Sequence, residues 1–82
     1  MTNYQFNALN DHGKENAVWS GTLLGGRQDL HHNIMLYQVD SFYVEVFYYR
    51  GSDRIIRFRS FISVDALDPY LHQIRISSLF KK

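Results

Sequence analysis

The sequence contains no cysteine, and this excludes disulfide bonds and thiolate metal sites. It also has no apolar run near the roughly 20 residues that cross a bilayer, so we expect no membrane span. The start, MTNYQFNALNDHG, lacks the basic residues and apolar run of a signal peptide. Together these features predict a cytoplasmic protein.

The 82 residues are enough for one domain and exclude a second. Hydrophobic residues make up 45% and charged residues 21%, close to the globular average, so neither disorder nor a coiled coil fits. One Trp, six Tyr and six Phe stand against a single proline. We therefore expect a bulky core stabilised by packing alone.

The net charge of +1 conceals an uneven distribution. Residues 1–49 carry five acidic and two basic residues, a net charge of −3, whereas residues 50–82 carry three acidic and seven basic residues, a net charge of +4. The two halves either neutralise each other on folding or leave a basic face for phosphate or an acidic partner.

The residue composition of the chain changes near residue 17. Residues 1–16 are polar and rich in Asn, which suggests an N-terminal arm or an extra edge strand. From residue 17 to 82, short β-branched and aromatic runs broken by turn residues predict a single α+β domain. The strands are expected at 17–26, 32–39, 42–50 and 54–63.

Side chains alternate along a strand, so the turns can be tested by the faces they create. A two-residue Asp40-Ser41 turn and a Gly51–Asp53 loop both align apolar residues on one side, which we call the first face. The first-face pairs are Val39–Phe42, Tyr37–Val44, Met35–Val46, Tyr48–Ile56, Val46–Phe58, Val44–Ser60 and Phe42–Ile62. A turn at residues 28–30 adds Leu23–Met35, Gly21–Tyr37 and Trp19–Val39.

After Ser63 the apolar spacing becomes helical, with Leu67, Tyr70, Leu71 and Ile74 on one stripe. Asp65 or Asp68 can cap such a helix. We expect this helix to pack on the first face, giving an α+β fold: a four-stranded antiparallel β-meander with one C-terminal α-helix packed on one sheet face.

The opposite side of the sheet, the second face, is too apolar for water. Cross-strand geometry there predicts a Glu45–Arg59 ion pair and an Arg57–Phe47 cation–π contact. The residues expected on the second face are Leu36, Gln38, Tyr43, Glu45, Phe47, Tyr49, Ile55, Arg57, Arg59 and Phe61.

This aromatic surface predicts a small non-enzymatic interaction module that self-associates as a homodimer, because aromatic residues and Arg are typical of interface cores. The expected contact residues are Tyr43, Phe47, Tyr49, Arg57, Arg59 and Phe61. Three alternatives stay open. Residues 4–9 could fold back over the face, single-stranded nucleic acid could stack on it, or a small ligand or another protein could cover it.

The sequence contains no clear motif for a metal site, a catalytic nucleophile or a phosphate-binding loop. The adjacent His31 and His32 point to opposite sides of a strand and fit solvated turn residues, and His12 and His72 fit surface positions. No GxSxG motif is present, and Gly25-Gly26-Arg27 fits a turn or bulge better than a phosphate loop. We therefore expect no catalytic residue, cofactor or metal, with a pocket near Tyr37, Tyr70 and His72 as the remaining enzyme alternative.

The stretch LYQVDSFYVEVFYYR, followed by IIRFRSF and LDPYL, resembles a group of small uncharacterised bacterial proteins of about this length. The resemblance covers residues 34–71. No activity is attached to that group, so the resemblance implies no site residues.

Overall fold

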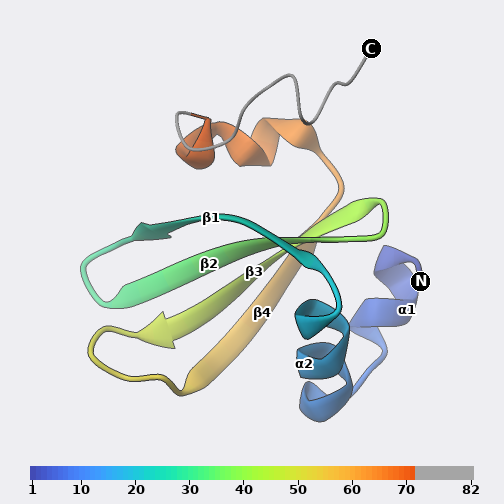
Figure 1. Cartoon of the computed structure of the whole chain (residues 1–82), viewed down its shortest axis with the longest axis horizontal. Helices are drawn as coiled ribbons and strands as arrows, with labels where there is room; N and C mark the ends of the chain where they lie inside the picture. Colours follow the sequence, from blue (N-terminus) through green and yellow to red (C-terminus); the bar gives the residue numbers. More distant parts are fainter. Residues whose placement is uncertain (72–82) are drawn as a thin grey trace.

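Figure 1 shows a computed structural model of the chain, which describes residues 1–71. Four strands form one open antiparallel sheet in the order β1-β2-β3-β4, which confirms the predicted meander and the α+β class. In chain order the elements are α1 (Asn3–Asn7), α2 (Asp11–Trp19), β1 (Thr22–Gln28), β2 (His32–Val39), β3 (Phe42–Tyr49), β4 (Ile55–Phe61) and the 3-10 helix η1 (Val64–Tyr70). Within residues 1–71, no helix is both long and apolar enough to span a membrane.

The predicted register is confirmed between β2 and β3 and in the centre of β3–β4. Val39 pairs with Phe42 across the turn at Asp40, whose φ is 52°, and Val46 pairs with Phe58. The register is wrong beyond a shift at Phe47/Tyr48, where Tyr48 pairs with Ile55 instead of Ile56. This irregularity turns Ile55 from the expected second face into the core of the first.

The register of β1 is also wrong. The β1–β2 turn differs from the expected one, since Gln28 pairs with Asn33. A bulge between Leu23 and Gly25 changes the register once more, and Leu23 pairs with Tyr37 and not with Met35. The strand also begins at Thr22, because the residues before Ser20 belong to α2. The expected pairs of Trp19 and Gly21 with β2 are therefore absent from the ladder.

The N-terminal segment is neither an arm nor an edge strand; it contains α1 and α2. The Thr2 side chain accepts a hydrogen bond from the Gln5 backbone while the Gln5 side chain accepts one from the Thr2 backbone, a reciprocal capping box. Asn10 caps α2 by accepting from the Gly13 N–H at 2.8 Å. The polar residues that suggest an arm are thus the caps of two short helices.

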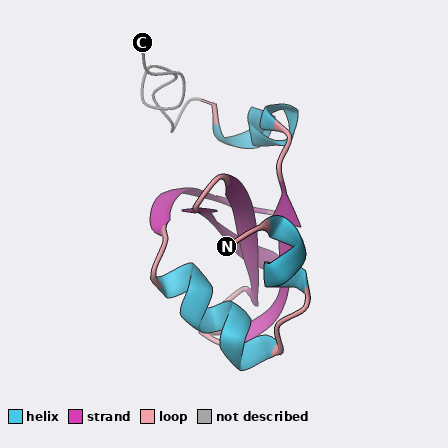
Figure 2. Cartoon of the chain, turned by 90° about the vertical axis from the view of Figure 1, so that its right-hand side faces the viewer, coloured by secondary structure: helices cyan, strands magenta, loops and turns pink. Residues whose placement is uncertain are grey.

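The first face is covered by α1 and α2, on one side of the sheet in both views (Figures 1 and 2). Phe6 from α1 lies 5.6 Å from the ring of Phe42 and 6.1 Å from that of Phe58. The buried members of this core are Phe6, Val18, Val39, Phe42, Val44 and Val46. The predicted C-terminal helix does not occupy this face in the described residues.

The second face is covered by η1, on the other side of the sheet (Figure 1). Leu67 and Tyr70 are buried against Leu36 and Tyr43. The expected C-terminal α-helix is thus a 3-10 helix over Val64–Tyr70, with the side chain of Ser63 capping its start, and it packs on the face opposite to the one predicted. The rest of the expected helix, residues 72–78, lies outside the described residues.

Candidate functional site

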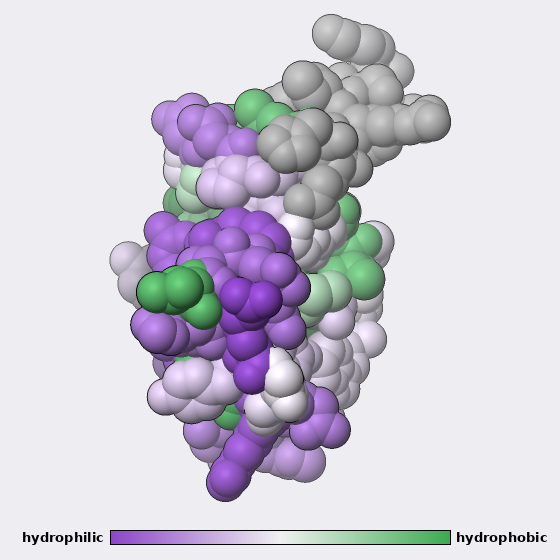
Figure 3. All heavy atoms as spheres, turned by 90° about the vertical axis from the view of Figure 1, so that its left-hand side faces the viewer, coloured by the Kyte–Doolittle hydropathy of each residue, from purple (hydrophilic) through white to green (hydrophobic). Residues whose placement is uncertain are grey.

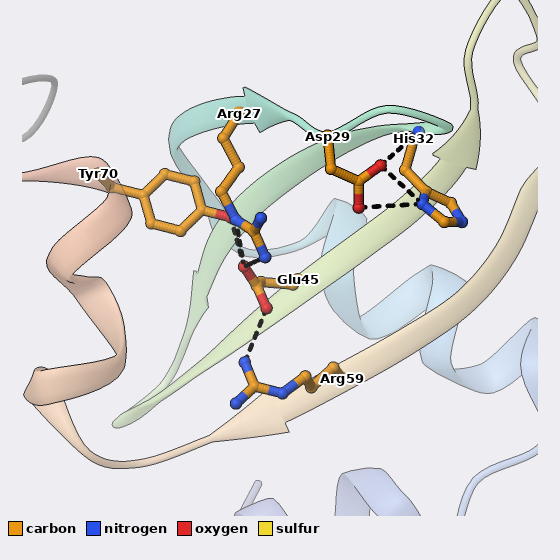
Figure 4. A network of polar contacts seen from close by, with 6 residues as sticks. All are labelled: Arg27, Asp29, His32, Glu45, Arg59 and Tyr70. Atoms are coloured by element: carbon orange, nitrogen blue, oxygen red, sulfur yellow. Dashed lines mark hydrogen bonds and ion pairs between the residues drawn. The ribbon is translucent and has the colours of Figure 1, made fainter.

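Glu45 lies at the centre of the second face and is the one buried charged residue within residues 1–71, with 1% of its surface exposed. Both carboxylate oxygens accept hydrogen bonds (Figure 4). Arg59 donates from Nη1 to Oε1 at 2.8 Å, and Tyr70 donates its hydroxyl to Oε2 at 2.5 Å. Arg27 adds contacts to Oε2 from Nε at 3.2 Å and from Nη2 at 3.1 Å.

Three elements converge to place these partners. Arg59 on β4 is the cross-strand neighbour of Glu45, Arg27 comes from β1, and Tyr70 comes from η1. A buried carboxylate without partners costs several kcal/mol, so the two guanidinium groups and the hydroxyl are needed for this packing. Burial, together with the hydrogen bond to the Glu45 carboxylate, raises the pKa of Tyr70 well above its usual value near 10.

Arg57, like Arg59, is exposed at the site. Its guanidinium carbon lies 3.8 Å from the centre of the Phe47 ring, which confirms the predicted cation–π contact. Asp11 and Glu15 border a small hollow of about 80 Å³ with Arg57 at the edge of β4, yet Arg57 forms no ion pair with any residue of the described chain. Its charge is therefore free to meet an anion.

Asp29 and His32 form a second, more exposed pair. Asp29 Oδ1 accepts hydrogen bonds from the backbone N–H groups of His31 at 2.9 Å and His32 at 2.7 Å, and lies 2.9 Å from His32 Nδ1. Desolvation opposes ionisation of this carboxyl, but these hydrogen bonds prevail and lower the pKa of Asp29. The His32 ring stacks on Tyr49 with centroids 5.8 Å apart.

An open hollow of about 400 Å³ lies between η1 and the second face. We call it the arginine hollow. Its lining residues are Arg27, Asp29, Glu45, Phe47, Arg57, Arg59, Ala66 and Pro69. Three guanidinium groups face two carboxylates, both of which already have partners inside the chain. The hollow is thus suited to a carboxylate or phosphate group, which a guanidinium can bind through two parallel hydrogen bonds.

The six residues expected to form the contact surface divide into two groups. Tyr43 and Phe47 are 8% and 3% exposed, because Tyr43 packs with η1 and Arg57 stacks on Phe47. Tyr49 is 56% exposed. The remaining three are Arg57 and Arg59, which are exposed, and Phe61, which is half-buried.

The structure bears on two of the alternatives raised from the sequence, the fold-back of residues 4–9 and the pocket near Tyr37, Tyr70 and His72. Phe6, within the 4–9 segment, does fold back within the chain, but onto the first face. Tyr37 packs against the first core and Tyr70 against the second, so the expected pocket between them is absent, and His72 lies outside the described residues. His31 and His32 belong to no group of three metal-ligating side chains within residues 1–71.

Arg27 and Tyr70 belong to the site although the sequence does not reveal them there. The two glycines before Arg27 indicate a turn or bulge, and the helical spacing around Tyr70 predicts that Tyr70 packs on the first face. Arg27 reaches Glu45 because the register at the β1–β2 turn pairs Arg27 with Ile34, which lies opposite Phe47 on the second face. No family model, curated protein or solved structure matches this chain.

Proposed function

We propose that this protein is a small non-enzymatic interaction module that binds a negatively charged partner in the arginine hollow. The observation that carries the proposal is the state of Arg57. It is exposed, stacked on Phe47 and without a carboxylate partner in residues 1–71, while two further arginines stand beside it.

The hollow supports binding because its arginines are already held in place. Glu45 engages Arg27 and Arg59 through different oxygens, and Phe47 supports the plane of Arg57. Ordering a long side chain on association costs about 0.5–1.5 kcal/mol, so arginines fixed before binding lose less. Their remaining N–H groups stay available, because each guanidinium carries five donors.

The chemistry of the hollow favours binding over catalysis. Glu45 is the buried carboxylate, and both of its oxygens already accept hydrogen bonds from Arg27, Arg59 and Tyr70. A general base must lie within hydrogen-bond reach of the substrate proton, and Glu45 is only 1% exposed. Glu45 therefore serves as an internal counterion that positions the arginines.

A protein partner with exposed carboxylates fits better than single-stranded nucleic acid. Base stacking needs accessible aromatic faces, and Tyr43 and Phe47 are covered within the chain. Tyr49 is left as the exposed aromatic residue among those expected to bind. At the end of the molecule that carries the β1–β2 and β3–β4 turns, hydrophilic residues predominate and hydrophobic spots are small (Figure 3).

The proposal retains self-association but changes its driving force. Burial of Tyr43 and Phe47 inside the subunit removes much of the apolar area expected to hold a homodimer. Charged contacts at Arg57 and Arg59 are then the main attraction, so the interaction should weaken with salt. A cytoplasmic location is part of the proposal and can be tested by fractionating cells that express a tagged chain.

The proposal is tested by titrating a fluorescent Glu-rich peptide at two salt concentrations. Binding should be detected at low salt and weaken several-fold when ionic strength rises tenfold, because the Debye length falls from about 30 to about 10 Å between 0.01 and 0.1 M. Arg57→Gln should weaken it about tenfold, equivalent to about 1.4 kcal/mol. Arg50→Gln is the matched control, since exposed Arg50 does not line the hollow.

Two outcomes would contradict the proposal. One is the absence of peptide binding at low salt. The other is an equal loss in both arginine variants, which would indicate general charge attraction. A labelled oligothymidine run in parallel identifies nucleic acid as the partner class if it binds more tightly than the peptide and loses affinity in Arg57→Gln.

A further inference from the structure

We infer that the anionic partner of the arginine hollow is a second copy of this chain, docked head to tail through an acidic groove on the first face. This inference rests on the proposed function, because it names the partner of the same site. The groove is a hollow of about 410 Å³. It is lined by Glu15, Trp19, Tyr48, Asp53, Arg54 and Ile55.

The groove combines negative charge with an exposed aromatic side chain. Glu15 and Trp19 come from α2, and Asp53 comes from the loop between β3 and β4. Trp19 is 49% exposed, and its ring packs edge-on against Tyr37 with centroids 5.6 Å apart. A partly supported Trp of this kind is a frequent anchor of protein interfaces.

The carboxylates of Glu15 and Asp53 form no ion pair within the described chain, although Arg54 lines the same groove. The ion pairs within residues 1–71 use Asp29, Asp40 and Glu45, and none involves Glu15 or Asp53. The pKa of Tyr48 is raised by burial and also by the negative charges of Glu15 and Asp53. The uneven charge seen in the sequence is therefore only partly neutralised by folding.

The arginine hollow and the acidic groove complement each other in charge. Within residues 1–71, Arg57 forms no ion pair on one surface and Glu15 and Asp53 form none on the other, although Arg57 and Glu15 also border one small hollow at the edge of β4. Trp19 of one copy can in addition rest on the apolar wall that Ala66 and Pro69 give the hollow. The second copy thus supplies the carboxylates that complete the site around Arg57.

The two surfaces belong to opposite faces of the sheet, and this sets the symmetry. Tyr48 packs with the first core, whereas its neighbour Phe47 lines the arginine hollow. Each copy then uses one surface as donor and the other as acceptor, a heterologous contact that closes into a ring or continues as a chain. A two-fold dimer would instead bring the same face of both copies together.

Substitutions that reverse the charge of one surface at a time test the inference. Arg57→Glu makes both surfaces acidic, and Glu15→Arg with Asp53→Arg makes both basic, so we expect each variant to be monomeric in analytical ultracentrifugation at low salt. Wild-type protein should show a mass that rises with concentration. An equimolar mixture of the two variants should associate again, because each offers the complement of the other. Arg50→Glu has the same charge change as Arg57→Glu outside both surfaces, and it should associate like the wild type.

Three results would overturn the inference: a wild-type monomer at the highest concentration reached in low salt, variants that associate like the wild type, or mixed variants that stay monomeric although circular dichroism shows both folded. The Glu-rich peptide separates this failure from failure of the proposed function. Peptide binding by a strictly monomeric wild type would leave the arginine hollow intact as a site and refute only the second copy as its partner.

Discussion

Removing the hydroxyl of Tyr70 tests whether its hydrogen bond to buried Glu45 stabilises the fold. Tyr70→Phe keeps the ring in contact with Leu36 and Tyr43, so the packing of η1 is preserved. It deletes the 2.5 Å hydrogen bond to Glu45 and the one accepted from Arg27 at 3.2 Å. A hydrogen bond to a charged group contributes about 1.5–3 kcal/mol. We expect a loss of about 2 kcal/mol, since Glu45 keeps both arginines.

Urea unfolding followed by circular dichroism measures this loss. With an m value of about 1–2 kcal/mol/M for a domain of this size, the midpoint should fall by about 1–2 M. Tyr49→Phe is the control, because the exposed Tyr49 hydroxyl makes no hydrogen bond within residues 1–71. Its midpoint should stay close to that of the wild type.

The pH dependence gives a second, independent readout. The pKa of Tyr70 is raised in the folded state above its unfolded value of about 10. Its contribution to stability is therefore complete below about pH 10 and is lost as pH rises above that value, where the unfolded chain releases the proton first. Tyr70→Phe lacks this term, so the stability gap to the wild type should narrow above about pH 10. A gap that is absent at neutral pH, or that widens in alkaline solution, would refute the reasoning.

Three further substitutions, one of them with a control variant, test other contacts in the fold. Glu45→Gln leaves Arg27 and Arg59 without their counterion and should lower the free energy of unfolding by about 1–3 kcal/mol in urea. Phe6→Ala should cost about 3–5 kcal/mol, whereas Tyr4→Ala on the exposed side of the same helix should cost little, as thermal unfolding can show. Gly21→Ala should also lower the melting temperature, because its Cβ would collide with the backbone oxygen opposite.

The central sheet could be predicted from the sequence because its signals are local. The Asp40-Ser41 turn and the period of two fix the β2–β3 pairing without reference to the rest of the chain. The Glu45–Arg59 and Phe47–Arg57 neighbours follow from the next loop in the same way. The β3–β4 half of the candidate site is therefore readable from strand alternation and turn chemistry.

The other half depends on irregularities that alternation does not reveal. The register at the β1–β2 turn brings Arg27 to the face of Glu45, and a bulge after Leu23 changes the register again. An alternation of hydrophobic and polar residues reveals neither. The helices α1 and α2 bury few large side chains, chiefly Phe6 and Val18, so their helical period is weak. Their capping residues are the better signal.

The polarity of each sheet face explains which segment covers it: α1 and α2 on the first face and η1 on the second. The first face offers Val44 and Val46, which aliphatic and aromatic side chains of α1 and α2 can cover without any hydrogen bond. The second face contains Glu45, whose buried carboxylate gains a donor beyond Arg27 and Arg59 when the covering segment supplies one. Tyr70 brings that donor as well as an apolar ring, whereas Phe6 and Val18 bring none. A buried carboxylate in a strand therefore favours a covering segment whose buried side chain carries a donor. Through Tyr70, η1 meets this condition on the face opposite to the one that hydrophobic periodicity alone predicts.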